Sequence, residues 1–104
     1  MHDKIPVSVI VYSRLDCHLC GVIHRMARHL QKELSFELQK IDVTADEKLV
    51  AAYGDRVPVV LIDQRERFSG TVTEGQLRRA IKKARWRSPI SRILSRIKLA
   101  LTRG

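Results

Sequence analysis

The chain contains only two cysteines, and together they form a Cys17-His18-Leu19-Cys20 motif. The motif lies between a short apolar run, 7–12, and a segment whose apolar residues recur with helical spacing. A cysteine pair with this spacing, at a strand-to-helix junction near the start of a small αβ pattern, indicates a dithiol redox site. At a helix N-terminus, unpaired backbone N–H groups and the helix dipole lower the pKa of a thiol, whose thiolate is the reactive form.

The length and composition place the chain among small single-domain proteins. A length of 104 residues leaves no room for a second core, and 44% hydrophobic residues suffice for one. No run of apolar residues is long enough to cross a membrane, and residues 1–6 lack the charged and apolar parts of a signal peptide. We therefore expect a cytoplasmic protein. In that compartment we expect a cysteine pair to be catalytic, redox-active or metal-bound rather than a permanent structural disulfide.

Periodicity in the sequence predicts four strands and three helices. The first helical segment, 17–34, is amphipathic, and Thr44 or Asp46 can cap a short second helix that Gly54 closes. Asp63 and Gln64 are expected to form a turn between the last two strands. The expected strands are 7–12, 35–43, 57–62 and 65–69, with a last core helix capped by Thr73 and ending near 84. The order β-α-β-α-β-β-α predicts a parallel pair followed by a hairpin.

This α/β pattern resembles the glutaredoxin side of the thioredoxin-fold superfamily over residues 7 to 84. The resemblance rests on the Cys17-x-x-Cys20 motif after the first strand and on Val57-Pro58 at the start of the third. The segment 12–20 is also similar to a group of small bacterial glutaredoxin-like proteins with a Cys-His-Leu-Cys site. The fold implied is a thioredoxin-like sandwich, here followed by a basic amphipathic C-terminal helix.

The resemblance also implies roles for individual residues. Cys17 corresponds to the nucleophile and Cys20 to the resolving thiol of a thiol–disulfide oxidoreductase. The Val57–Pro58 bond is implied to be cis, with the Val57 backbone contacting an extended thiol substrate. Pro58 has a simpler interpretation as the first residue of a strand, where a missing N–H is tolerated.

Charged residues near the motif are candidates for tuning the thiolate. His18 follows the nucleophile, and Arg14 is the next nearest fixed positive charge in the sequence. Asp16, immediately before Cys17, would oppose thiolate formation. An exposed His18 without a chemical role is the competing interpretation.

Glutathione and metal ions are the ligands to consider. The segment 68–74 has one glycine and an acid where glutaredoxins hold a glutathione carboxylate. We therefore expect no cofactor, with glutathione left open as a co-substrate beside protein or small-molecule disulfides. Zinc is an alternative, because Cys17, Cys20 and His24 form C-x-x-C-x-x-x-H, although zinc usually takes four ligands and only His18, His2 or water could complete the set.

The positive charge is concentrated at the C-terminus. Residues 1–84 hold fourteen Lys and Arg and eleven Asp and Glu, a net charge of +3, whereas 85–104 hold six Lys and Arg and no acid, a net charge of +6. We expect a domain over 1–84 and a basic amphipathic helix after Ser88-Pro89 within 85–104.

The apolar face of this C-terminal helix needs a partner. It can pack on its own domain or on a second copy, or bind an anionic membrane with Trp86 at the interface. Nucleic acid is the least favoured partner, because no series of base-stacking aromatic residues is present. An alternative function is therefore a non-enzymatic adaptor whose C-terminal helix makes the contact.

Overall fold

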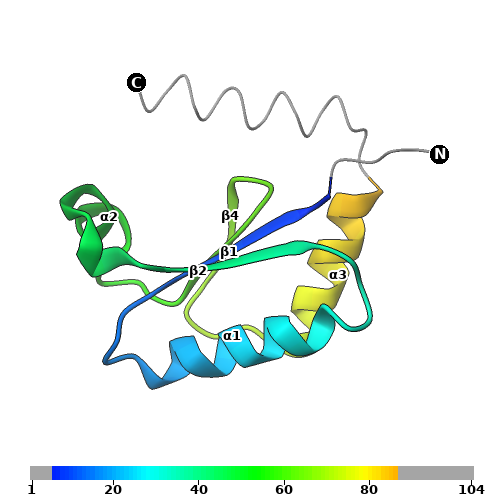
Figure 1. The fold of residues 1–104 in the computed structure, drawn as a ribbon, viewed down its shortest axis with the longest axis horizontal. Coiled ribbons are helices and arrows are strands. Elements are labelled where there is room, and N and C mark those ends of the chain that lie inside the picture. The colour runs from blue at the N-terminus through cyan, green and yellow to red at the C-terminus, as the bar shows by residue number, and fades with distance from the viewer. Residues whose placement is uncertain (1–5, 87–104) are drawn as a thin grey trace.

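The computed structural model describes residues 6–86, and these residues form one α/β unit around a four-stranded sheet (Figure 1). The order of the strands across the sheet is β2-β1-β3-β4. β1 pairs in parallel with β2 and antiparallel with β3, and β3 pairs antiparallel with β4. The strands are β1 (Ser8–Ser13), β2 (Glu37–Asp42), β3 (Val59–Ile62) and β4 (Arg65–Ser69). The parallel pair and the hairpin expected from the sequence are both confirmed.

Within 6–86, two α-helices and one short 3₁₀ helix connect the strands, and a third α-helix follows the last strand. They are α1 (His18–Leu30), the 3₁₀ helix η1 (Val43–Ala45), α2 (Glu47–Tyr53) and α3 (Glu74–Arg85). Asp46 caps α2 and Gly54 closes it, as expected. Thr73 caps α3 in a reciprocal capping box, in which its hydroxyl accepts the Gln76 N–H and the Gln76 side chain accepts the Thr73 N–H. The fold is the thioredoxin-like sandwich that the sequence predicted.

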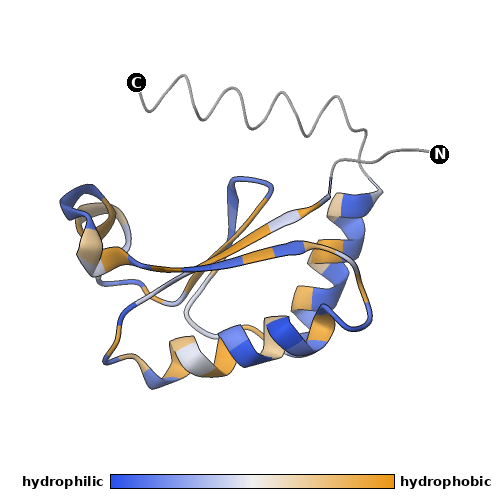
Figure 2. Ribbon diagram, in the orientation of Figure 1, coloured by the Kyte–Doolittle hydropathy of each residue, from blue (hydrophilic) through white to orange (hydrophobic). Residues whose placement is uncertain are grey.

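Alternation along β1 divides the core between the two faces of the sheet. Val9 and Val11 belong to a cluster with residues of α1 and α3, whereas Ile10 and Tyr12 pack with residues of α2. Figure 1 accordingly shows α2 well separated from α1 and α3. Figure 2 shows α1 and α3 banded with hydrophobic and hydrophilic residues, as expected of helices that cover a sheet.

Several element boundaries differ from the sequence prediction. β1 covers 8–13 rather than 7–12, and β2 covers 37–42 rather than 35–43. α1 ends at Leu30 instead of continuing to Leu34, because residues 31–34 form turns in which Glu33 and Leu34 both donate to the Leu30 carbonyl. Leu34 nevertheless stays buried, so its periodicity reflected core packing rather than helix. The third strand begins at Val59 rather than Val57. Just before it, the Pro58 carbonyl accepts the Gly70 N–H.

The expected C-terminal helix and most of the 85–104 extension lie outside the described residues. Within the described residues, α3 ends at Arg85, and the Trp86 side chain is largely exposed. Across residues 6–86, every helix is too short or too polar to traverse a bilayer.

Candidate functional site

Cys17 occupies the N-cap position of α1. Its backbone is extended and its sulfur accepts the N–H of Cys20, with 3.1 Å between sulfur and nitrogen. An N-cap side chain normally satisfies one of the unpaired N–H groups of the first turn, and here a sulfur does so. The same N–H groups and the helix dipole favour negative charge on this sulfur when it is reduced.

The two cysteines form a disulfide across the first turn of α1. Their Cα atoms are 5.3 Å apart, within the usual range for bridged pairs. Cys17 is partly exposed, whereas Cys20 is 1% exposed and lies against the core. One sulfur of the pair is therefore accessible to a partner and the other is not.

The loop before Cys17 is held by Arg14. The Arg14 carbonyl accepts the Cys17 N–H, and its guanidinium donates from Nη1 to the Gly54 carbonyl at 3.3 Å, at the C-terminal end of α2. Arg14 Nε also lies 3.4 Å from Asp16 Oδ1, close enough for an ion pair but without hydrogen-bond geometry. Arg14 thus joins the cysteine loop to α2, and Asp16 has a cationic partner.

A hollow of about 310 Å³ opens beside Cys17. Both proposed tuning residues, Arg14 and His18, line it together with Cys17. His18 is the first residue of α1 and is exposed. Other lining residues come from α1 and β2: Gly21, Arg25, Lys40 and Asp42.

The Val57–Pro58 peptide bond is cis. Tyr12 is opposite Val59 in the β1–β3 register, so the segments that follow β1 and precede β3 lie at the same end of the sheet. Pro58 is buried and Val57 half-buried, and neither lines the hollow beside Cys17. The structure therefore gathers Cys17, His18 and Arg14 around one hollow and places Val57-Pro58 outside it.

Three charged residues of this hollow are not assigned to a site by the sequence analysis: Arg25, Lys40 and Asp42. Arg25 lies within the helical segment 17–34 predicted from the sequence, and Lys40 and Asp42 lie within the predicted strand 35–43. The spacing of His18, Gly21 and Arg25 along one helix face was a usable signal. Lys40 had no local signal, because only the parallel register that pairs it with Val11 brings it to this end of the sheet.

Asp42 is held by Thr44 and by nearby cations. Its Oδ1 accepts the Thr44 N–H at 2.9 Å and the Thr44 hydroxyl at 2.7 Å. These hydrogen bonds, helped by the charges of Arg14 and Lys40, hold the pKa of the Asp42 carboxyl below its usual value. The carboxylate is therefore an ionised cap of η1.

The described part of the chain contains no group of side chains suited to the alternative of a metal site. Within 6–86, no three His, Cys, Asp or Glu side chains cluster closely enough to hold an ion. His24, the third residue of the suggested C-x-x-C-x-x-x-H set, has its pKa lowered by burial and by the charges of Lys40 and Arg28. Those two cations would also oppose binding of a metal cation at His24.

A four-stranded sheet flanked by helices, with a disulfide-linked cysteine pair opening the first helix, defines a thioredoxin-fold protein with a candidate redox centre. Solved thioredoxins share this fold: a mutant thioredoxin from Halobacterium salinarum matches with a TM-score of 0.64 and 24% identity, covering 81% of this chain and 79% of that one. At that identity the likeness shows the fold alone.

The chain belongs to the glutaredoxin-like domain family (DUF836), whose model matches residues 8–82. A protein from Nitrosomonas europaea, solved in solution by NMR, is similar with a TM-score of 0.62 and 32% identity over 74% of this chain and 94% of that one. Uncharacterised proteins from Mycobacterium bovis and Mycobacterium tuberculosis are 36% identical over 87 residues, covering 79% of this chain and 90% of theirs. The family, the fold and the disulfide-linked pair together support a redox role.

Proposed function

We propose that this protein is a thiol–disulfide oxidoreductase that works through Cys17 and Cys20. The observation that carries the proposal is the asymmetry of the pair: the accessible sulfur caps a helix, and its disulfide partner is buried one turn further on. An accessible sulfur at a helix N-terminus is suited to attack, and a buried neighbour is suited to resolve the product.

The proposed reaction transfers two electrons. The Cys17 thiolate attacks one sulfur of a substrate disulfide; a Cys17–substrate bond forms and the other substrate sulfur leaves as a thiolate. Cys20, after losing its proton to solvent, attacks the Cys17 sulfur and releases the second substrate thiolate. The substrate disulfide is thereby reduced to two thiols, and the protein becomes the Cys17–Cys20 disulfide. A thiol reductant then returns the protein to the dithiol state, and the reverse sequence oxidises a substrate.

Arg14 and His18 are proposed as the residues that favour the Cys17 thiolate. Both line the hollow into which Cys17 opens. Arg14 is a positioning residue in this proposal, because its side chain holds the loop to Gly54 while Asp16 offsets part of its charge. A protonated His18 would add a positive charge beside the thiolate.

Val57 and Pro58 are proposed to contact the substrate backbone. In support, the segment that precedes β3 lies at the same end of the sheet as the cysteine loop that follows β1. Val57 is also only half-buried. The substrate is a protein or small-molecule disulfide, with glutathione as a candidate co-substrate. We propose a cytoplasmic location, where a reducing thiol pool would regenerate the dithiol.

The proposal is tested by equilibrating the protein in glutathione redox buffers and alkylating its thiols. A reversible two-electron transition between dithiol and disulfide is expected, and it should be absent in Cys17→Ser and in Cys20→Ser. A protein that forms no Cys17–Cys20 disulfide in any buffer would refute the mechanism. That result would favour the alternative of a binding module, for which deletion of 85–104 should abolish partner or membrane binding.

A further inference from the structure

Four cations form a basic strip that runs from the cysteine site along α1. The strip consists of Arg25, Arg28 and Lys32 on α1 and the turn that follows it, and Lys40 on β2. All four side chains are exposed, and none forms an ion pair with another residue of 6–86. Leu38 packs into the core between the sheet and α1, so Lys40, two residues further along β2, faces the same side.

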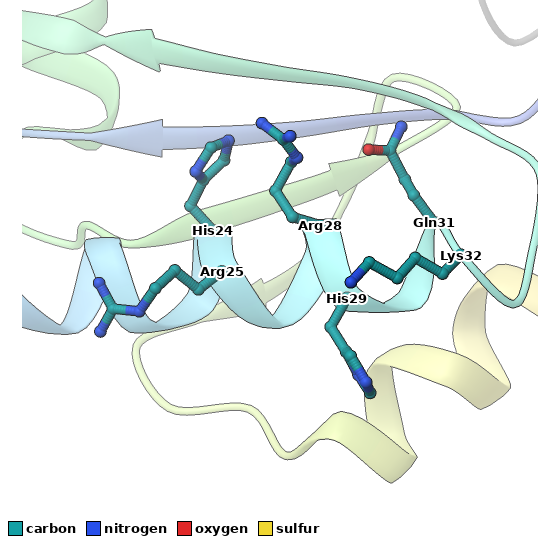
Figure 3. Close-up of a pocket in the computed structure, with 6 residues that line it drawn as sticks. All are labelled: His24, Arg25, Arg28, His29, Gln31 and Lys32. Carbon is teal, nitrogen blue, oxygen red and sulfur yellow. The ribbon is translucent and has the colours of Figure 1, made fainter.

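Two hollows meet at Arg25 and make the basic strip continuous with Cys17. The hollow beside Cys17 includes Arg25 and Lys40. A second hollow, of about 550 Å³, continues along α1 and is lined by His24, Arg25, Arg28, His29, Gln31 and Lys32 (Figure 3). In Figure 3, His24 and Arg28 extend toward the strands, whereas His29 points toward α3, where it pairs with Glu74.

Two acids belong to the surroundings of the strip. Glu33, which follows Lys32 in the chain, is bound by the Arg78 guanidinium at 2.8 Å. Asp42 is hydrogen-bonded to the neutral Thr44, so it keeps its charge and offsets part of the charge of Lys40. The positive charge of the strip also affects His24. Burial and the charges of Lys40 and Arg28 lower the pKa of this histidine. Four clustered cations that a single acid, Asp42, offsets only in part form an environment in which a bound anion is stabilised.

We infer that the basic strip docks an acidic segment of a protein disulfide substrate while its disulfide meets Cys17. The inference rests on the proposed function and adds to it the class of substrate. Cys17 and Lys32 lie about 22 Å apart along α1 and the turn that follows it, if the helical rise per residue is applied throughout. An extended peptide covers that length with about seven residues, whereas a small thiol spans only the first hollow.

Two further observations favour a protein over a nucleic acid. Neither hollow is lined by a Phe, Tyr or Trp side chain, the large aromatic rings on which single-stranded bases stack. Leu15 is 93% exposed in the loop before Cys17 and gives an apolar contact for a peptide beside its disulfide. Acidic residues placed to one side of a substrate cysteine would then lie along the basic strip.

The test uses short peptides whose single cysteine is a mixed disulfide with 2-thiopyridone. One peptide carries aspartates along one side of the cysteine, and a second carries asparagines at the same positions. The reduced full-length protein is mixed with each peptide in the absence of other thiols, and thiopyridone release is followed. Rates with dithiothreitol, an uncharged dithiol, correct for the intrinsic reactivity of each peptide. The experiment is done at about 0.02 M and about 0.5 M salt, because screening weakens surface electrostatics.

We expect the aspartate peptide to react at least about tenfold faster than the asparagine peptide at low salt, and the preference to vanish at high salt. Arg28→Glu with Lys32→Glu, two residues that line only the second hollow, should remove the preference and leave the asparagine rate nearly unchanged. The matched control is Arg65→Glu with Arg67→Glu, which alters net charge equally at two exposed residues of β4, the opposite edge strand from β2. That variant should keep most of the preference.

The outcomes separate this inference from the proposed function. If both peptides react equally, or both double variants lose the preference alike, docking on the strip is refuted while the redox function stands. If neither peptide reacts, the proposed function fails, and docking on the strip is then tested by binding alone. Binding of the aspartate peptide to Cys17→Ser should raise the pKa of His24, which an NMR titration measures. Tighter binding of a single-stranded oligonucleotide than of the aspartate peptide would overturn the inference in favour of nucleic acid.

Discussion

The Cys20 backbone nitrogen lies 3.1 Å from the sulfur of Cys17, so the first turn of α1 is capped by the atom that also bonds the Cys20 side chain. When the disulfide is reduced, this N–H remains available to the Cys17 thiolate, and hydrogen bonds to a charged acceptor are stronger than neutral ones. The cap is thus shared between the folding of α1 and the proposed chemistry of the site.

The two cysteines should have different mutant phenotypes. We expect Cys17→Ser to lower the rate of disulfide reduction by more than about a thousandfold, because a serine hydroxyl does not replace a thiolate nucleophile. Cys20→Ser should instead accumulate a mixed disulfide on Cys17, which intact mass spectrometry detects. The assignment would be reversed if Cys17→Ser accumulated the adduct and Cys20→Ser did not.

The Glu33–Arg78 pair should make stability depend on pH in the acid range. The hydrogen bond from Arg78 lowers the pKa of Glu33, so the unfolded state takes up a proton at higher pH than the folded state does. This contribution is present above the ordinary glutamate pKa and is lost as the pH falls through the lowered value. Urea denaturation over this range should show a shallower loss for Glu33→Gln than for Glu37→Gln, an exposed acid outside the ion pairs of residues 6–86.

His24 should report the charge of its neighbours. Lys40 and Arg28 add to burial in lowering its pKa, and Arg25 is its neighbour in the second hollow. Because the unfolded state binds the proton more readily, this histidine costs stability as the pH falls below its ordinary value. Lys40→Gln should raise the pKa of His24 in an NMR titration, whereas Lys48→Gln on α2 should leave it unchanged. Equal responses to both substitutions would contradict the local origin of the shift.

Asp63 should be important for stability although it lies in a turn. Its side chain is fully buried, its Oδ1 accepts the Ser8 N–H at 3.0 Å, and its own N–H donates to the Ser8 carbonyl. Asp63→Ala leaves the Ser8 donor without this partner and should lower the free energy of unfolding by about 1–3 kcal/mol. Chemical denaturation measures the change. Asp63→Asn retains an acceptor oxygen and should lose less, and an equal loss would point to the charge instead.

Gln64 is a position where a smaller residue should stabilise the fold. Asp63 and Gln64 both have positive φ, 51° and 69°, as in a two-residue hairpin turn between β3 and β4. Glycine adopts this conformation without a side-chain clash, so Gln64→Gly should raise the free energy of unfolding by about 0.5–1 kcal/mol. Gln76→Gly, inside α3, should lower it under the same denaturation protocol. A decrease for Gln64→Gly would contradict the left-handed turn.

Local chemistry decided much of the fold, and these features were predictable from the sequence. The start of α1 at the cysteine motif, the Thr73 cap of α3 and the turn at 63–64 each depend on residues a few positions apart. The same holds for the cysteine pair, because four consecutive residues in one helical turn place both sulfurs together. The error at Leu34 arose because burial, and not helix, maintained the apolar spacing there.

The surroundings of the cysteine pair depended on tertiary structure. Arg14 reaches Gly54, forty residues away, only because α2 ends beside the cysteine loop. Lys40 joins Arg25 at the hollow beside Cys17 because β2 pairs in parallel with β1, a register that no local pattern specifies. The sequence by itself therefore determined the fold class and the cysteine pair, which follow from short-range periodicity and spacing. The charges and hollows around the pair were decided by contacts between residues far apart in the chain.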